Sequence, residues 1–180
     1  MHKRIAILRG INVGGKRKIL MADLKSMFEK MKFSNVHTYI QSGNVFFESK
    51  NDIDNIELSK NIEEALKEAF GLEVPVIVRT PKEIETAISQ NPFYRNDSDI
   101  GHLHLTFLKE EPTDENQDKA KSYNYEPDRF KIKGRDIFIY CEGKYHQSKL
   151  TNNFFEKKLK VGATTRNWKT VLKLFELSKN

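Results

Sequence analysis

Short apolar runs and segments with helical spacing alternate along the first half of the chain. Apolar residues recur three or four positions apart in 21–32 and 56–70, which predicts two amphipathic helices. Gly71 follows the second as its expected C-cap, and Gly43-Asn44 is expected to form a tight hairpin turn because both residues tolerate positive φ. The runs that predict strands are 3–10, 36–41, 45–48 and 74–79. The resulting order, β-α-β-β-α-β, is the ferredoxin-like unit.

The second half repeats this pattern less completely. Residues 81–90 predict a connecting helix with Pro81 at its first position. No final strand is evident, and 165–177 predicts a terminal helix instead. The other expected elements are strands at 102–108, 129–132 and 137–141 and helices at 114–122 and 148–160. We therefore expect an α+β fold of two ferredoxin-like subdomains, 1–80 and 81–180, with the second imperfect and followed by a C-terminal helix.

The amino-acid composition indicates the net charge of the protein and the cellular compartment in which we expect it. The chain has 180 residues, 38% of them hydrophobic and 31% charged, which is typical of a globular protein in water. Lys plus Arg total 31 against 25 Asp plus Glu, so the net charge of +6 favours anionic partners. No run approaches a membrane span, and the N-terminal apolar run is too short for a signal peptide. The single Cys141 fits a reducing compartment, so we expect a cytoplasmic protein without a membrane partner.

The segment from Gly10 to Lys16 fits the pattern G-x-x-x-x-G-K and follows a strand, as a phosphate-binding loop would. Arg17 stands where that motif needs a Ser or Thr hydroxyl for magnesium. The next helix also begins near Met21, too late for its N-terminus to contact the phosphates. These departures argue against a nucleotide triphosphatase. Two interpretations remain open, a looser nest of backbone N–H groups for an anion and a glycine-rich corner without a ligand.

The expected topology brings this loop close to a second polar segment. The first two strands of the unit run parallel, so their C-terminal ends share one edge of the sheet. The loop 9–18 and the turn 41–44, sequence QSGN, should therefore lie side by side. The corresponding loop of the second half, 109–114, reads KEEPTD and is acidic. An anion site is accordingly predicted in the first half.

Two cations of the second half occupy predicted helix starts, where the helix dipole disfavours them. They are Lys149 and Arg166, and each is unfavourable there unless an anion or a carboxylate lies nearby. A salt bridge to an acidic residue would explain either one alone. If one anion site explains both together with Arg9 and Lys16, the second half must fold back so that its helix starts face the glycine loop.

The motifs LRGINVGGK, TYIQSGNV, VPVIVRT, NPF, SKLT and ATTRNWKTVLKL occur in this order along the chain. In these segments the chain resembles the bacterial family known as domain of unknown function 1697. The resemblance implies a pair of ferredoxin-like subdomains, and it implies no known reaction and no catalytic residues. The signature positions of the family fall here on Arg9, Gly10, Asn12, Gly14, Gly15, Lys16, Gln41, Ser42, Gly43, Asn44, Arg79, Lys149, Thr165, Arg166 and Asn167.

These observations predict a cytoplasmic protein that binds a small anionic, phosphate-bearing ligand at a basic edge rich in Gly, Asn and Gln. The alternatives are a nucleic-acid-binding module and a protein-interaction domain without a ligand. No metal site is predicted, because His102 and His104 share a strand face without a third ligand, and the sequence indicates neither a reaction nor a cofactor. The predicted ligand-binding residues are Arg9, Asn12, Gly14, Gly15, Lys16, Gln41, Ser42, Asn44, Lys149, Arg166 and Asn167.

Overall fold

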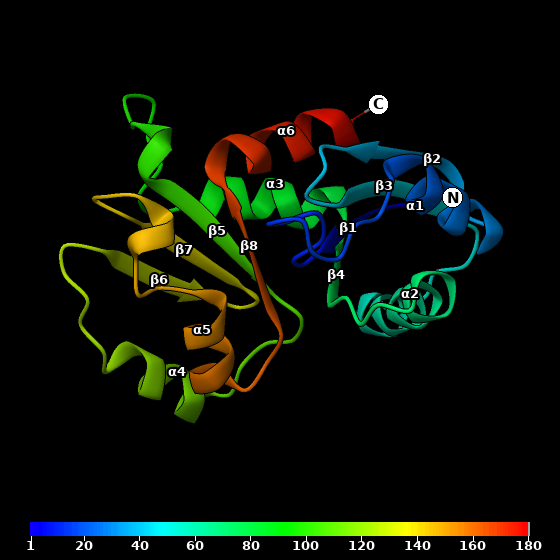
Figure 1. Cartoon of the computed structure of the whole chain (residues 1–180). Helices are drawn as coiled ribbons and strands as arrows, with labels where there is room; N and C mark the ends of the chain where they lie inside the picture. Colours follow the sequence, from blue (N-terminus) through cyan, green and yellow to red (C-terminus); the bar gives the residue numbers. More distant parts are fainter. Residues whose placement is uncertain (180) are drawn as a thin grey trace. The chain divides into compact units, whose positions relative to one another are not determined.

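The chain has a mixed α+β fold that contains two four-stranded antiparallel sheets (Figure 1). The structure, a computed structural model, describes residues 1–179. It divides into two compact units, unit 1 (Met1–Glu83) and unit 2 (from Ile84 onward). The predicted fold class is confirmed.

Unit 1 has the ferredoxin-like topology, with its strands in the order β2-β3-β1-β4. Helices α1 and α2 contribute Phe28, Leu58 and Ile62 to a core that includes Leu8 and Phe47 of the sheet. Its elements are β1 (His2–Leu8), α1 (Met21–Lys30), β2 (Ser34–Tyr39), β3 (Asn44–Ser49), α2 (Asn55–Phe70) and β4 (Val76–Arg79).

The ends of α2 and of the next helix follow the signals in the sequence. The Asp54 carboxylate accepts hydrogen bonds from the N–H groups of Ile56 at 2.8 Å and Glu57 at 3.3 Å. Gly71 ends α2 at a positive φ of 67°, as predicted. Helix α3 (Pro81–Gln90) begins at the predicted proline.

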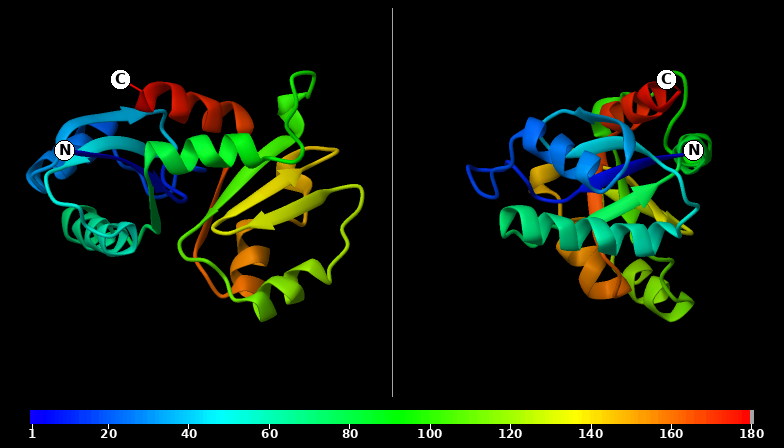
Figure 2. Two further views of the ribbon diagram at one scale, coloured as in Figure 1. Left: turned by 180° about the vertical axis from the view of Figure 1, so that it is seen from behind. Right: turned by 90° about the vertical axis from the view of Figure 1, so that its right-hand side faces the viewer.

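Unit 2 has the same topology in a complete form, with strand order β6-β7-β5-β8. In both views of Figure 2, α4 and α5 lie together on one side of this sheet. After α3, the elements are η1 (Ile100–His102), β5 (Leu103–Leu108), α4 (Asp114–Lys121), β6 (Arg129–Lys133), β7 (Asp136–Tyr140), η2 (Tyr145–Gln147), α5 (Asn152–Leu159), β8 (Ala163–Asn167) and α6 (Trp168–Ser178).

The final strand of unit 2 was missed by the sequence prediction, and the terminal helix was placed too early. Strand β8 pairs antiparallel with β5, from Leu108 opposite Ala163 to His104 opposite Asn167. Its sequence ATTRN has no large apolar residue, so it shows no alternating pattern, and pairing with β5 decides its conformation. Helix α6 then begins at Trp168, with Asn167 as its N-cap.

The later start of α6 also changes which of its side chains are buried. Trp168 and Val171 are buried, as the predicted apolar stripe requires. Leu174 is fully buried as well, whereas Leu172 and Phe175, which were expected in the stripe, are half-exposed. The stripe therefore follows a spacing of three residues from Trp168.

The two units repeat the same backbone hydrogen bonds around their first strand. The Leu8 N–H donates to the Gly43 carbonyl at 2.8 Å, and the Leu108 N–H donates to the Arg135 carbonyl at 2.9 Å. The next residues, Arg9 and Lys109, donate to the carbonyls of Pro75 and Gly162 at 2.9 and 2.8 Å. These bonds align the two units residue by residue at the edge where the anion site was predicted.

Candidate functional site

The glycine loop and the β2–β3 turn lie side by side in unit 1, as the topology predicted. The hydrogen bond from Leu8 to Gly43 joins the end of β1 to the turn. A second contact comes from the Asn12 side-chain amide, which donates to the Gln41 carbonyl at 2.9 Å. We call the surface formed by residues 9–20 and 40–43 the loop corner.

The turn itself differs from the predicted tight Gly43-Asn44 hairpin turn. Tyr39 of β2 pairs with Asn44 of β3, so four residues, 40–43, connect the strands. Positive φ occurs at Ile40 (52°) and Gly43 (81°) and not at Asn44. A β-branched residue such as Ile40 rarely adopts positive φ. The identity of residue 40 therefore did not indicate that the turn begins there.

Gly43 is required by the packing as well as by its φ. A Cβ atom at this position would lie 2.6 Å from Ile11 Cδ1 and 2.9 Å from Leu8 Cβ. Both neighbours belong to the fully buried core of unit 1. The glycine therefore lets the turn approach the glycine loop, a structural role that the prediction of ligand-binding residues did not include.

Residues 12–17 form a small hairpin. The Asn12 N–H donates to the Arg17 carbonyl, and the Lys16 N–H donates to the Val13 carbonyl, both at 3.1 Å. Gly14 and Gly15 lie between them with φ of 58° and 74°, as a type I′ turn requires. The loop thus uses two of its amides internally and has the shape of a hairpin, unlike a phosphate-binding loop that opens directly into a helix.

The Asn12 side chain fastens this hairpin to its surroundings. Its amide donates to the carbonyls of Ile19 at 3.0 Å and Gln41 at 2.9 Å, and its oxygen accepts from the Ile19 N–H at 2.9 Å. Asn44 is likewise fully buried, and its amide donates to the Tyr39 carbonyl at 3.0 Å. The contacts of both asparagines position the loop corner.

Three successive cations, residues 16–18, lie at the end of the hairpin and directly after it. Lys16, Arg17 and Lys18 are all exposed, and so is Gln41 on the adjacent turn. Within residues 1–179, neither Lys16 nor Lys18 is part of an ion pair. The following helix α1 has Leu20 at its N-cap, which provides no side-chain cap. Arg17 and Lys18 were absent from the predicted ligand-binding set, although their charge was visible in the sequence.

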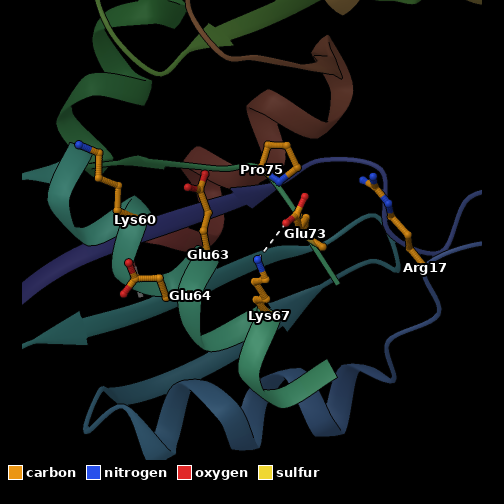
Figure 3. Close-up of a pocket in the computed structure, with 8 residues that line it drawn as sticks. Arg17, Lys60, Glu63, Glu64, Lys67, Glu73 and Pro75 are labelled. Carbon is orange, nitrogen blue, oxygen red and sulfur yellow. Dashed lines mark hydrogen bonds and ion pairs between the residues drawn. The ribbon is translucent and has the colours of Figure 1, made fainter. Parts of the chain in front are cut away.

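Arg17 also lines a surface cavity of about 520 Å³ that lies against α2 (Figure 3). The Glu73 carboxylate on its wall has a pKa below its usual range, mainly because Lys67 donates a hydrogen bond to it at 3.0 Å. Arg17 adds a smaller attraction in the same direction. Since Lys60, Glu63 and Glu64 also line the cavity, its charges balance and it lacks the cationic excess of residues 16–18.

The three predicted ligand-binding residues of unit 2 lie in surroundings that the sequence did not indicate. Lys149 precedes α5, whose N-cap is Thr151, and its Nζ lies 5.6 Å from the centre of the Tyr125 ring. Arg166 belongs to β8 and is buried, and Asn167 caps α6. The argument that Lys149 and Arg166 oppose helix dipoles is therefore wrong, because neither residue lies in the first turn of a helix.

Burial dominates the electrostatics of Arg166. Its guanidinium donates to the Thr165 carbonyl at 3.1 Å and to the Thr164 hydroxyl at 3.4 Å. Desolvation lowers its pKa to about 10, so it keeps its charge at neutral pH.

Two further features bear on possible cofactors and partners. No group of three or more His, Cys, Asp or Glu side chains in the described part of the chain could hold a metal ion. Among residues 1–179, no helix combines the length and apolar character needed to cross a bilayer.

Comparisons with known proteins identify the family. No curated protein matches the chain. A conserved bacterial protein, SP0830 from Streptococcus pneumoniae, has a similar structure, with a TM-score of 0.77, 23% identity and 98% of each chain covered. The model of the family "Protein of unknown function (DUF1697)" matches residues 1–138, a range that includes the loop corner and ends before the SKLT and ATTRNW motifs. The chain therefore belongs to the DUF1697 family.

Proposed function

We propose that unit 1 binds a small phosphate-bearing anion at the loop corner. The observation that carries this proposal is the run of three successive exposed cations at the end of the hairpin, Lys16 to Lys18, next to a backbone that the bonds of Asn12 hold in place. Exposed like charges in sequence repel one another, and a bound anion relieves this repulsion. Lys16, Arg17 and Lys18 together with the Gln41 side chain supply donors suited to phosphate oxygens.

The start of α1 supports the same ligand. Helix N-termini carry N–H groups without intrahelical partners and a partial positive charge. In α1 the N-cap Leu20 provides no side-chain acceptor for them, whereas Thr113 accepts from the Asn116 N–H at the equivalent helix α4 of unit 2. An uncapped helix start that follows a cationic hairpin is compatible with an anion.

The direct test is isothermal titration calorimetry of the full chain with pyrophosphate. We expect saturable binding of one ligand, weakened at least about tenfold in Lys16→Gln/Lys18→Gln, because a hydrogen bond to a charged group contributes about 1.5–3 kcal/mol. The matched control is Lys50→Gln, an exposed lysine just after the far end of β3, which should bind like the parent. Equal affinity in all three proteins would refute the proposal.

A protein-interaction role is the second candidate, and one observation favours it. Val13, Leu20 and Ile40 are exposed large hydrophobic residues of the loop corner, with 64%, 70% and 46% of their surface accessible. Apolar side chains beside a run of exposed cations fit an acidic protein partner. The calorimetry separates the two functions, because saturable binding of one pyrophosphate supports the anion site, whereas absence of such binding favours the acidic partner.

Nucleic acid remains the third candidate for the same corner, through its phosphate backbone. A strand whose phosphates contact several cations loses affinity steeply as salt rises, with a slope near −0.7 for each phosphate contacted. A single small anion loses less. Salt titrations of pyrophosphate and oligonucleotide binding therefore discriminate between these ligands.

A further inference from the structure

A second cationic surface of different composition lies in unit 2. It follows the connection from α4 to β6 and the edge strand β6, whose course is visible in Figures 1 and 2. The surface combines lysines with aromatic rings. We call the surface formed by Lys119, Lys121, Tyr123, Tyr125, Arg129 and Lys131 the basic aromatic track. None of these residues belongs to the loop corner.

The first part of the track is a cavity of about 670 Å³ beside β6. Phe93, Tyr125 and Phe130 line it together with Arg129 and Lys131. The Arg129 guanidinium lies 5.4 Å from the centre of the Phe93 ring. The cavity therefore combines aromatic rings with cations, the two kinds of group that stack bases and contact phosphates on single-strand binding surfaces.

The second part is a cavity of about 360 Å³ between the C-terminal ends of α4 and α5. Four lysines line it, and Tyr123 is a wall of this cavity and of the first one. The Lys158 ammonium lies 4.1 Å from the centre of the Tyr123 ring. Because both cavities are lined by Tyr123, they adjoin at this residue.

The positive charge of the track is greatest at the second cavity. Two carboxylates line the first cavity beside Lys121, Arg129 and Lys131 and offset much of its charge, whereas the charged residues that line the second are all lysines. One of the two carboxylates, Asp128, accepts hydrogen bonds from the Glu142 N–H at 3.0 Å and the Ser148 hydroxyl at 2.6 Å. Glu115 pairs with Lys119 at 2.6 Å on the exposed side of α4. Glu126 is the other acidic residue that lines the first cavity.

Ordinary structural roles explain the lysines separately but not their arrangement. Lysines in a last helical turn complement the helix dipole, and basic side chains on an edge strand deter pairing with another chain. Neither role calls for aromatic rings between the two groups. Tyr123 nevertheless stays 39% exposed, and it stacks on Tyr125 with ring centres 6.0 Å apart.

The spacing along β6 matches a strand of nucleic acid. Arg129, Lys131 and Lys133 alternate on β6 and are all exposed. Side chains two positions apart on a strand lie about 6.6 Å apart, which is close to the separation of neighbouring phosphates in an extended strand. A single phosphate could occupy only one of these positions.

We propose that unit 2 binds single-stranded nucleic acid along the basic aromatic track, with bases stacked on the tyrosine pair and phosphates on the cations of α4 and β6. This binding is independent of the proposed anion site in unit 1. RNA and DNA share the chemistry that the track recognises, so both are included in the test.

The test measures fluorescence anisotropy of labelled RNA and DNA oligonucleotides of about 12 nucleotides, a length within the range of single-strand sites. Lys121→Gln/Lys131→Gln should weaken binding at least tenfold and make the log–log salt slope shallower by about 1.4, which is two contacts at about 0.7 each. Tyr123→Ala should weaken binding about tenfold, whereas Tyr123→Phe, which keeps the ring, should stay near the parent. Circular dichroism melts verify that each variant is folded.

The matched control is Lys144→Gln/Lys169→Gln, which removes two exposed lysines of unit 2 outside the track and should bind like the parent. Lys16→Gln/Lys18→Gln in unit 1 should also leave oligonucleotide binding unchanged. Loss of binding in that variant, unchanged binding in the track variants, or equally effective displacement by polyglutamate would each overturn the proposal. The last result would assign the track to acidic peptides.

Discussion

The two units share one topology and differ in the loops that connect their strands and helices. In unit 1, twelve residues, 9–20, lie between β1 and α1, and they carry the cationic hairpin. In unit 2 the same connection is 109–113, KEEPT, which is short and acidic and provides the N-cap of α4. The backbone hydrogen bonds at the end of the first strand are nevertheless the same in both.

The comparison extends to the last strand of each unit. Arg79 is the last residue of β4 and Arg166 the penultimate residue of β8. Each lies two residues before the start of the next helix, and both are buried. Each guanidinium donates to the carbonyl of the preceding residue, at 3.2 Å in one and 3.1 Å in the other. The buried framework is therefore repeated, while the exposed loops set the charge of each unit. Function is expected where the units differ.

The largest contrast is expected at the two glycines of the equivalent turns. Gly43→Ala should lower the free energy of unfolding by about 2–5 kcal/mol, because it adds a left-handed conformation costing about 1–2 to an overpacking cost of about 1–3. Gly134→Ala should cost only about 1–2 kcal/mol, because nothing lies within 4 Å of the added Cβ. Chemical denaturation measures both, and similar losses would contradict the close approach of Ile11.

The paired arginines should behave alike. Arg166→Lys is expected to lose about 1–3 kcal/mol, because an ammonium cannot reproduce the buried hydrogen bonds of the guanidinium. Arg79→Lys should lose a similar amount. Chemical denaturation of the ligand-free protein measures these losses of unfolding free energy. If Arg166→Lys left the stability unchanged, the structural role of Arg166 would be contradicted and a ligand-binding role would be favoured.

The helix starts should respond in opposite directions. Thr113→Ala removes the cap of α4 and should cost about 1 kcal/mol, whereas Leu20→Asp supplies a cap to α1 and should add about 1 kcal/mol. The added carboxylate should also weaken pyrophosphate binding at the loop corner, since its negative charge repels the anion. Thermal melts and calorimetry test the two effects, and tighter binding would contradict the site.

A smaller effect is expected from His104, which unit 1 does not match. Desolvation lowers the pKa of its imidazole, which stacks on Tyr145 with ring centres 4.5 Å apart. Below pH 6.5 the unfolded chain binds a proton that the folded state resists, so stability falls as the pH drops below this value. His104→Gln should flatten the decline between neutral and acidic pH, while the exposed His146→Gln should not.

The sequence predicted the framework better than the site. Apolar periodicity located every helix and strand of unit 1 within a few residues, because burial on one face determines it. It failed for β8, whose threonines depend on β5 for their conformation. At the loop corner the sequence predicted the adjacency of loop and turn, but not that Asn12 and Asn44 would use their amides internally. Side-chain partners arise from tertiary contacts, which no local pattern encodes.

The most direct test of the contrast between the units is an NMR titration of the ¹⁵N-labelled full chain with pyrophosphate. The account predicts saturable shifts for the amides of residues 13–18 and 41–43, which lie on the loop corner. It predicts no comparable shifts for 109–113 and 134–135, the equivalent segments of unit 2. Equal shifts in both sets, or none at the loop corner, would contradict the claim that the cationic hairpin distinguishes unit 1 as the anion-binding unit.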